Sequence, residues 1–151
     1  MLLMIIRTAT IEDFEELYRL GLQTKEFRVS ANESFMDEDE FRARIMSGED
    51  IFLVAEVGPK LVGFALFGFH DKDRLLKNRY ACLVYLVVEI EYRRKGIAGK
   101  LYEEGIVRLK EKGITHVYSW ANAQSDNSMI NFLKKRKYKL GQQYVWMDKK
   151  I

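Results

Sequence analysis

Residues 87–101 read VVEIEYRRKGIAGKL, and this stretch decides how the rest of the chain is interpreted. It begins in an apolar run typical of a strand covered on both faces, and it ends in the first turn of a helix. Between the two lie Arg93, Arg94, Lys95 and Gly96. Unpaired amides and the dipole at a helix start attract anions, and small residues let a ligand approach the backbone. The stretch therefore predicts a cradle for a pyrophosphate group.

Apolar periodicity on both sides of this stretch predicts alternating strands and helices. Thr10 and Asp13 form an expected capping box for a helix that begins at Phe14. We expect strands at 5–9, 51–57, 61–69, 80–88 and 114–120, one or two strands within 138–147, and helices at 14–21, 37–47, 97–112 and 125–135. This order predicts a mixed α+β fold, with a mainly antiparallel sheet and a parallel pair across the strand–helix–strand unit at 80–120.

Composition restricts the class of protein. The chain has 151 residues, 48% of them hydrophobic and 31% charged, which predicts one soluble domain over 1–151 and excludes disordered and collagen-like classes. A net charge of +3 is too small to indicate nucleic-acid binding. Cys82 is the single cysteine, so no internal disulfide can form, and a cytoplasmic location is expected. The apolar start is too short for a membrane span, and no metal-ligand spacing occurs.

The quoted stretch resembles the signature of the GNAT superfamily of acyl-CoA-dependent N-acyltransferases, Arg/Gln-x-x-Gly-x-Gly/Ala. Arg93 to Ala98 match that signature, and Val88 with the Glu91-Tyr92 dipeptide matches the residues that precede it. The expected element order agrees from end to end, so the resemblance covers essentially the whole chain. It implies the GNAT fold, with splayed middle strands, and direct transfer of an acetyl group from acetyl-CoA to a primary amine.

The resemblance also implies which residues hold coenzyme A. The end of the 80–88 strand would pair with the pantetheine arm, the turn and helix start would surround the pyrophosphate, and the helix from residue 125 would contact the pantetheine. The residues implied are Leu86, Val87, Val88, Arg93, Arg94, Lys95, Gly96, Ile97, Ala98, Gly99 and Asn127, with Asp126 as the alternative to Asn127. The acceptor would be a protein N-terminus, a lysine or a small amine, without nucleic acid, membrane or metal, and a homodimer is compatible with the family.

The catalytic groups stay open at this stage. Leu133 stands where the family often has a tyrosine that protonates the leaving thiolate, so Tyr144, Tyr85 or water are the alternatives. Glu89 is a candidate base, although a solvated carboxylate is the more ordinary role for that position. A coenzyme A sensor or structural module with little catalysis is therefore the rival function.

Several further residues are weighed for the acceptor side of the site. Neither His70 nor His116 has a paired acid or nucleophile in the sequence, so a catalytic role for either has little support. The 25–35 segment, with Glu33 and Phe35, is expected to flank the acceptor, and Trp120 and Trp146 either line that site or belong to the core. The basic run at 134–137 is expected to be a solvated helix end, with one member reaching a cofactor phosphate.

Overall fold

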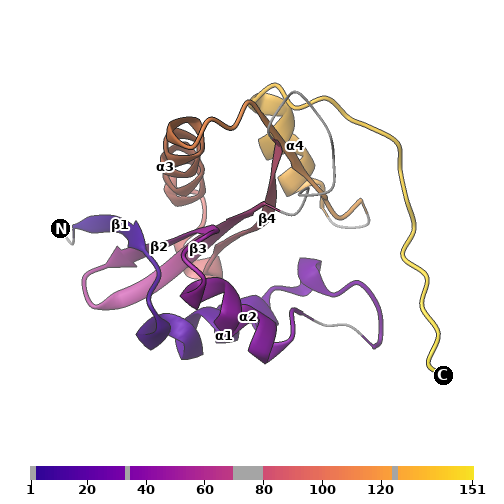
Figure 1. Cartoon of the computed structure of the whole chain (residues 1–151), viewed down its shortest axis with the longest axis horizontal. Coiled ribbons are helices and arrows are strands. Elements are labelled where there is room, and N and C mark those ends of the chain that lie inside the picture. Colours follow the sequence, from indigo (N-terminus) through magenta and orange to yellow (C-terminus); the bar gives the residue numbers. More distant parts are fainter. Residues whose placement is uncertain (1–2, 33–34, 70–79, 124–125) are drawn as a thin grey trace.

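The computed structural model describes residues 3–32, 35–69, 80–123 and 126–151. Five strands form one sheet in chain order (Figure 1). The first four are antiparallel neighbours, and the fourth and fifth are parallel. They are β1 (Met4–Thr8), β2 (Ile51–Val57), β3 (Lys60–Gly68), β4 (Tyr80–Val88) and β5 (His116–Ser119). This mainly antiparallel sheet with one parallel pair confirms the predicted fold class.

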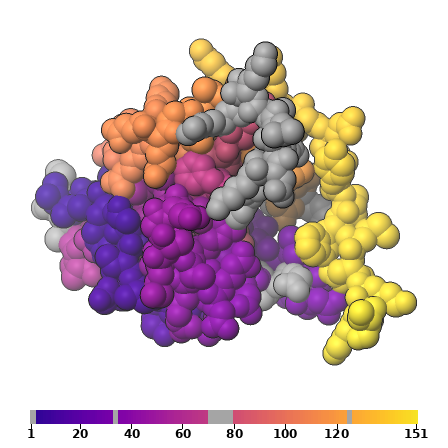
Figure 2. All heavy atoms as spheres, in the orientation of Figure 1, coloured from indigo at the N-terminus to yellow at the C-terminus, as the bar shows by residue number. Residues whose placement is uncertain are grey.

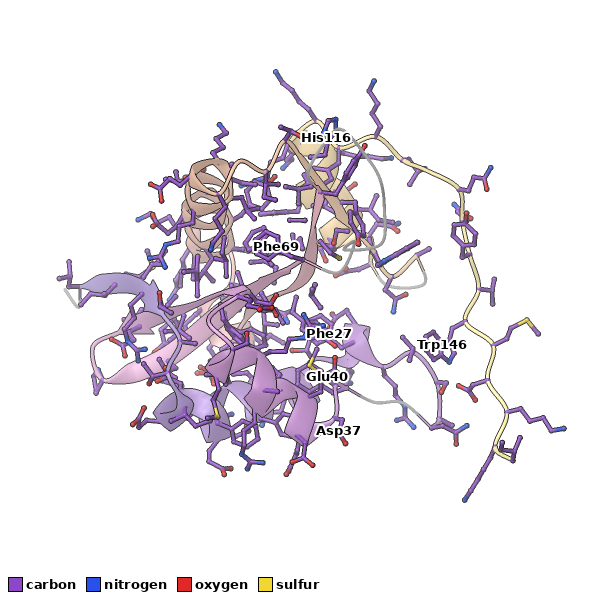
Figure 3. All side chains as sticks on the ribbon, in the orientation of Figure 1. Phe27, Asp37, Glu40, Phe69, His116 and Trp146 are labelled. Atoms are coloured by element: carbon purple, nitrogen blue, oxygen red, sulfur yellow. The ribbon has the colours of Figure 1, made fainter. Side chains whose placement is uncertain are left out.

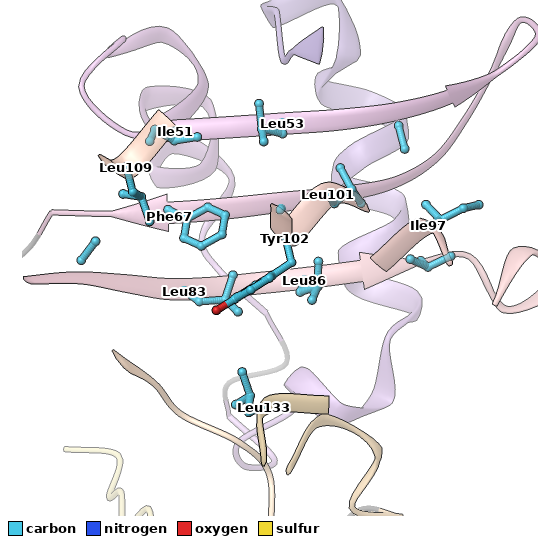
Figure 4. Close-up of a cluster of buried hydrophobic side chains, with 14 of the residues drawn as sticks. Ile51, Leu53, Phe67, Leu83, Leu86, Ile97, Leu101, Tyr102, Leu109 and Leu133 are labelled. Carbon is cyan, nitrogen blue, oxygen red and sulfur yellow. The ribbon is translucent and has the colours of Figure 1, made fainter. Parts of the chain in front are cut away.

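Helices cover both faces of the sheet (Figure 1). On one face lie α1 (Phe14–Gln23) and α2 (Glu38–Met46), and on the other lie α3 (Ile97–Glu111) and α4 (Ser128–Lys135). Short 3-10 turns are η1 (Ile11–Asp13), η2 (Lys25–Phe27) and η3 (Ile90–Tyr92). Figure 4 shows the core beneath the second pair of helices, where Leu101 and Leu133 face the sheet. In the described part of the chain, no helix combines the length and apolar character that crossing a membrane requires.

A β-bulge in β4 separates the middle strands. Leu66 of β3 pairs with Tyr85, whereas the next residue, Phe67, pairs with Leu83, so Val84 is an extra residue in β4. The parallel pairing with β5 ends at Leu83 and Ser119, immediately before that residue. Because a bulge bends a strand and increases its twist, residues 84–88 diverge from β5. The predicted splay of the middle strands is therefore present.

The expected strands within 138–147 are wrong. Residues 138–151 contain no helix or strand. Tyr138 still packs on the core, and the yellow end of the chain beyond it runs outside the sheet and helices (Figures 1 and 2). The large apolar side chains of this segment are exposed: Leu140, Tyr144, Val145, Trp146 and Met147. A segment rich in β-branched and aromatic residues is able to form a strand, but it does so only where the edge of another strand is available for pairing. In the described part of the chain, no strand pairs with this segment.

An ion-pair network connects the first strand with the start of α1. The Arg7 guanidinium donates two hydrogen bonds of 2.8 Å to the Asp13 carboxylate and two, of 2.6 and 3.0 Å, to Glu56 of β2. The backbone N–H of Thr10 also donates to Asp13, at 2.7 Å, as the predicted capping box requires. These hydrogen bonds, those from Arg7 foremost, hold the pKa of Asp13 below its usual value.

We expect Asp13→Asn to lower the free energy of unfolding at pH 7 by about 2 kcal/mol, because it removes charge-assisted hydrogen bonds from a buried position. The pKa of Asp13 is depressed in the folded state, so its contribution is present above about pH 4 and is lost as the pH falls through the folded-state pKa. Urea denaturation of both proteins at pH 7 and at lower pH measures this difference, which should shrink on acidification.

The matched control is Asp39→Asn, because the side chain of Asp39 is 96% exposed and pairs loosely with Arg42 at 3.7 Å. Exposed pairs of this kind contribute about 0–1 kcal/mol. Equal effects of the two substitutions at pH 7 would contradict the role given to Asp13.

Candidate functional site

A cleft of about 220 Å³ opens where β4 and β5 separate. One side of it is β4 itself, from Leu83 to Val88. Residues 119–122, which follow β5, form the facing side, and α4 contributes Ser128, Met129 and Phe132. The η2 turn closes the end nearest α1 and α2 with Glu26 and Phe27, and Figure 3 shows Phe27 on that side of the sheet. The cleft thus joins segments that are far apart in the sequence.

The backbone of β4 is exposed to this cleft along a short edge. At one end, the Ser119 hydroxyl donates to the Leu83 carbonyl at 2.8 Å and closes the last link between the two strands. At the other end, Nε of Arg93 donates to the Val88 carbonyl at 2.9 Å. Between these points, in the part of the chain that the structure describes, no strand pairs with the β5 side of β4. An extended ligand with amide groups can pair there as an added strand.

The turn before α3 presents its backbone outward. Arg94 and Gly96 both have left-handed backbone conformations, with φ of 62° and 80°. A side chain added at Gly96, the residue that caps α3, would meet no atom within 4 Å. The first turn of α3 contains no acidic residue, and its leading amides have no acceptor within the helix. This end of α3 therefore offers free N–H groups and a positive dipole to an anion.

Arg136 adds a cation to the same place. Its guanidinium lies 3.6 Å above the Phe132 ring and donates to the Phe132 carbonyl at 3.3 Å. A Cβ atom built at Gly99, in the first turn of α3, would lie 3.0 Å from its Nη2 atom. Among the four residues of the 134–137 run, Arg136 is therefore the one that the fold directs toward the start of α3. From the sequence we expect one residue of this run to reach a cofactor phosphate, but the sequence does not say which one.

The residues expected to bind coenzyme A differ in where the structure places them. Those on β4 together with Arg93 and Ala98 line the cleft, while Arg94 and Lys95 lie exposed on the turn. Ile97 is buried in the core instead, at 4% exposure. Asn127 has a left-handed backbone at the start of α4. The carboxylate of Asp126 accepts hydrogen bonds from the N–H and hydroxyl of Ser128, so it is used in ordering this turn.

Neither the candidate base Glu89 nor Leu133, which stands at the position of the family's tyrosine, lines the cleft. Oε2 of Glu89 lies 2.9 Å from Nζ of Lys60. Glu89 lines a separate hollow next to the cleft and does not line the cleft itself. Leu133 is buried in the core at 6% exposure and does not face the cleft. His116 is exposed on β5 and stacks on Tyr80. The other histidine candidate, His70, and the acceptor candidate Glu33 lie outside the described residues.

The aromatic candidates divide between core and surface. Tyr85 packs against Phe27, with ring centroids 4.6 Å apart, and against Phe35, at 5.0 Å, in the cluster beneath α1 and α2. Burial raises the pKa of Tyr85 to about 12, so its hydroxyl keeps its proton at neutral pH. Trp120 lines the cleft, and Tyr144 packs against it with centroids 5.9 Å apart. Trp146 lies out on the extended tail (Figure 3).

Glu26 is the residue that the sequence did not single out. Among the described residues that line the cleft, it carries the one carboxylate, and Arg93 carries the one full positive charge. The side-chain amide of Asn122 donates to the Glu26 carbonyl at 3.1 Å and so ties η2 to the segment that follows β5. No sequence motif includes Glu26. The one sequence signal for it was its position in the 25–35 segment, which was expected to flank the acceptor. No group of three or more potential metal ligands occurs in the described ranges.

Comparison with known proteins gives a consistent result. Residues 12–138 match the acetyltransferase (GNAT) family. An acetyltransferase of Sodalis glossinidius (strain morsitans) is 27% identical over 98% of this chain and 96% of its own length. Two solved structures share the fold. An aminoglycoside acetyltransferase from an uncultured soil metagenomic sample, in complex with sisomicin, has a TM-score of 0.70 and 20% identity over 98% of this chain and 96% of its own.

The second solved structure is the PaiA N-acetyltransferase of Thermoplasma acidophilum in complex with coenzyme A. Its TM-score is 0.61, with 21% identity over 88% of each chain. At this level of identity the two structures show the fold that this chain adopts.

We expect Gly63→Ala to disturb the cleft from the opposite side of β4. A Cβ atom at this position of β3 would lie 2.6 Å from the Val87 carbonyl oxygen, and a backbone atom cannot move aside as a flexible side chain can. The cost should be about 1–3 kcal/mol of stability, as for other overpacked positions. Urea denaturation measures it against Gly141→Ala, whose Cβ would meet nothing within 4 Å. A substitution at Gly63 as neutral as the control would contradict this packing.

Proposed function

Because the chain belongs to the GNAT acetyltransferase family, we propose that it transfers the acetyl group of acetyl-CoA to a primary amine by direct attack in a ternary complex. Residues 1–151 act together as one catalytic domain in this proposal. The observation that carries it is the cleft between the separated strands, which leads from the free edge of β4 to the amide-rich start of α3. Family membership supports an acyltransferase, and this geometry supports the thioester as the group it binds.

The cofactor-binding residues follow from that cleft. In the proposal, the pantetheine amides pair with the β4 backbone at Leu86, Val87 and Val88, as in β-strand addition. The pyrophosphate lies against the turn and first helical turn at 94–99, where backbone N–H groups, Arg94 and Lys95 meet it. Arg136 supplies a further charge beside Gly99. Arg93 has a positioning role, because its Nε already holds the Val88 carbonyl.

Glu26 is the proposed proton acceptor. An alkylamine with a pKa of about 10.4 is mostly protonated at neutral pH, so a proton must leave nitrogen before it attacks. Glu26 lines the cleft, whereas Glu89 does not line it and is paired with Lys60. The acidic residues at the start of α2 are less available to the amine. Asp37 accepts hydrogen bonds from the backbone of α2, and Glu40 lies 3.4 Å from Arg44.

The reaction then proceeds in one addition and one elimination. The amine nitrogen forms a bond to the thioester carbonyl carbon, and a β4 backbone N–H stabilises the negative oxygen. The nitrogen of the adduct then loses its extra proton to water, the carbon–sulfur bond breaks and releases the acetamide, and the coenzyme A thiolate takes a proton from water. Water fills this role because Leu133 is in the core, Tyr85 packs on the opposite face of the sheet, and Tyr144 does not line the cleft. Orientation of the two substrates supplies much of the acceleration in such a site.

We expect Gly96→Leu to weaken binding of acetyl-CoA by about 100-fold or more, because the side chain would occupy the space in front of the free helix amides. Gly48→Leu is the matched control, since both glycines have a positive φ and open space at Cβ. The backbone strain is therefore similar in the two variants, and only the first should lose affinity in isothermal calorimetry. Equal affinities would refute the pyrophosphate assignment.

We expect Glu26→Gln to lower kcat by about 10²–10⁴-fold, because a general base contributes a factor of that size, while binding of acetyl-CoA is retained. Thiol release across a panel of primary amines measures the rate, and Glu38→Gln on α2 serves as the control. An unchanged kcat would remove Glu26 from the mechanism. Tight binding of acetyl-CoA by the unmodified protein, without thiol release on any amine, would instead favour the sensor module.

A further inference from the structure

The cleft ends where β4 and β5 join, and one side chain closes that end. The parallel pairing of the two strands finishes at Leu83 and Ser119. There the Ser119 hydroxyl donates to the Leu83 carbonyl at 2.8 Å, in a partly buried position. Both residues line the cleft, and together they form what we call the strand junction. Ser119 therefore lies at the narrow end of the space between the diverging strands.

The direction of the cofactor arm in this cleft rests on the proposed function. Arg93 holds the turn before α3 against the Val88 carbonyl, so a pyrophosphate at the start of α3 lies at the Val88 end of β4. The extended pantetheine arm then runs along β4 from Val88 toward the bulge at Val84. Its two amides precede its sulfur, so the sulfur lies beyond the residues that pair with them. The acyl group therefore points at the strand junction.

Apolar side chains line the cleft on both faces of the sheet. Val84 and Phe27 belong to the cluster on the side of α1 and α2. Met129 and Phe132 of α4 pack against the core on the other side, which includes Leu83 (Figure 4). Between the two faces, the paired backbones of β4 and β5 stop a chain from passing deeper. An acyl group longer than acetyl would have to push the strands apart or displace these side chains.

We propose that Ser119 determines the length of the acyl group that this protein transfers, and that acetyl is the longest group it transfers efficiently. The Ser119 hydroxyl occupies the strand junction, and its hydrogen bond to the Leu83 carbonyl holds the two strands together at that point. Ser119 is thus a specificity-determining residue at the end of the acyl group. Proton transfer, by Glu26 or by another group, is separate from this role.

Thiol release from acetyl-, propionyl- and butyryl-CoA with one fixed amine tests the proposal. One additional methylene in a fitted apolar pocket changes kcat/KM by about 10–200-fold, so we expect the unmodified protein to prefer acetyl- over propionyl-CoA by about 10-fold or more. Butyryl-CoA should react more slowly still. Ser119→Ala should lower the preference for acetyl-CoA by about 10-fold, because it removes the hydroxyl and lets the strands separate.

Two further variants separate the role of this hydroxyl from a general loosening of the cleft. Ser119→Thr keeps a hydroxyl that can donate to the Leu83 carbonyl, so the preference for acetyl-CoA should be retained. Ser128→Ala removes a hydroxyl from the same cleft, but that hydroxyl donates to Asp126 and to neither strand. It should leave the acetyl-to-propionyl ratio unchanged. Both donors are compared in one sample, so partial unfolding of a variant lowers both rates equally and cancels from the ratio.

Equal activity of the unmodified protein with all three donors, or a ratio that Ser119→Ala leaves unchanged, would overturn the proposal. Failure of the proposed function looks different, because no donor would then release thiol with any amine. In that case calorimetry makes the same comparison through the dissociation constants of acetyl- and butyryl-CoA. Ser119→Ala should bring the two constants closer together. An unchanged ratio of the constants, or no binding of either donor, would overturn the role given to Ser119.

Discussion

One extra residue in β4 gives the molecule its site. Because Val84 is a bulge, β4 stays paired with β3 throughout but leaves β5 directly after Leu83. The two strands cannot rejoin, since residues 119–122 and the start of α4 line the opening between them. The free edge of β4, the cleft beside it and the exposed start of α3 all follow from this separation. A regular strand in the same position would continue the sheet and leave no space for a ligand.

The surrounding structure holds this opening in a fixed shape. Arg93 ties the turn before α3 to the last carbonyl of β4, and Asn122 ties η2 to the segment after β5. Gly63 lies directly behind β4 and lets β3 approach it closely. The backbone at Glu26 and the guanidinium of Arg136 are therefore positioned by contacts with residues of other elements. A site built in this way is preorganised, so binding does not have to order it.

The sequence predicted the elements that depend on local patterns. The signature at 93–98, the capping role of Asp13 and the apolar strands each involve residues within a few positions of one another. The bulge at Val84 could not be predicted from the sequence. It lies in a continuous apolar run, where no alternation of polar and apolar residues exists that an extra residue would break. Glu26 and Arg136 were not identified as site residues because only tertiary contacts bring them to the cleft. The strands expected within 138–147 are absent because a strand-like composition does not by itself provide a strand edge to pair with.

The account places the thioester-bearing arm of acetyl-CoA along the free edge of β4 and its pyrophosphate at the start of α3. The most direct measurement is a two-dimensional NMR titration of the isotope-labelled protein with acetyl-CoA, with the backbone amides assigned. The account predicts that the largest shifts, and slower exchange with solvent, occur at residues 84–88 and 94–99, while β1 and β2 change little. Saturable binding that leaves both segments unchanged, or no binding at all, would contradict it.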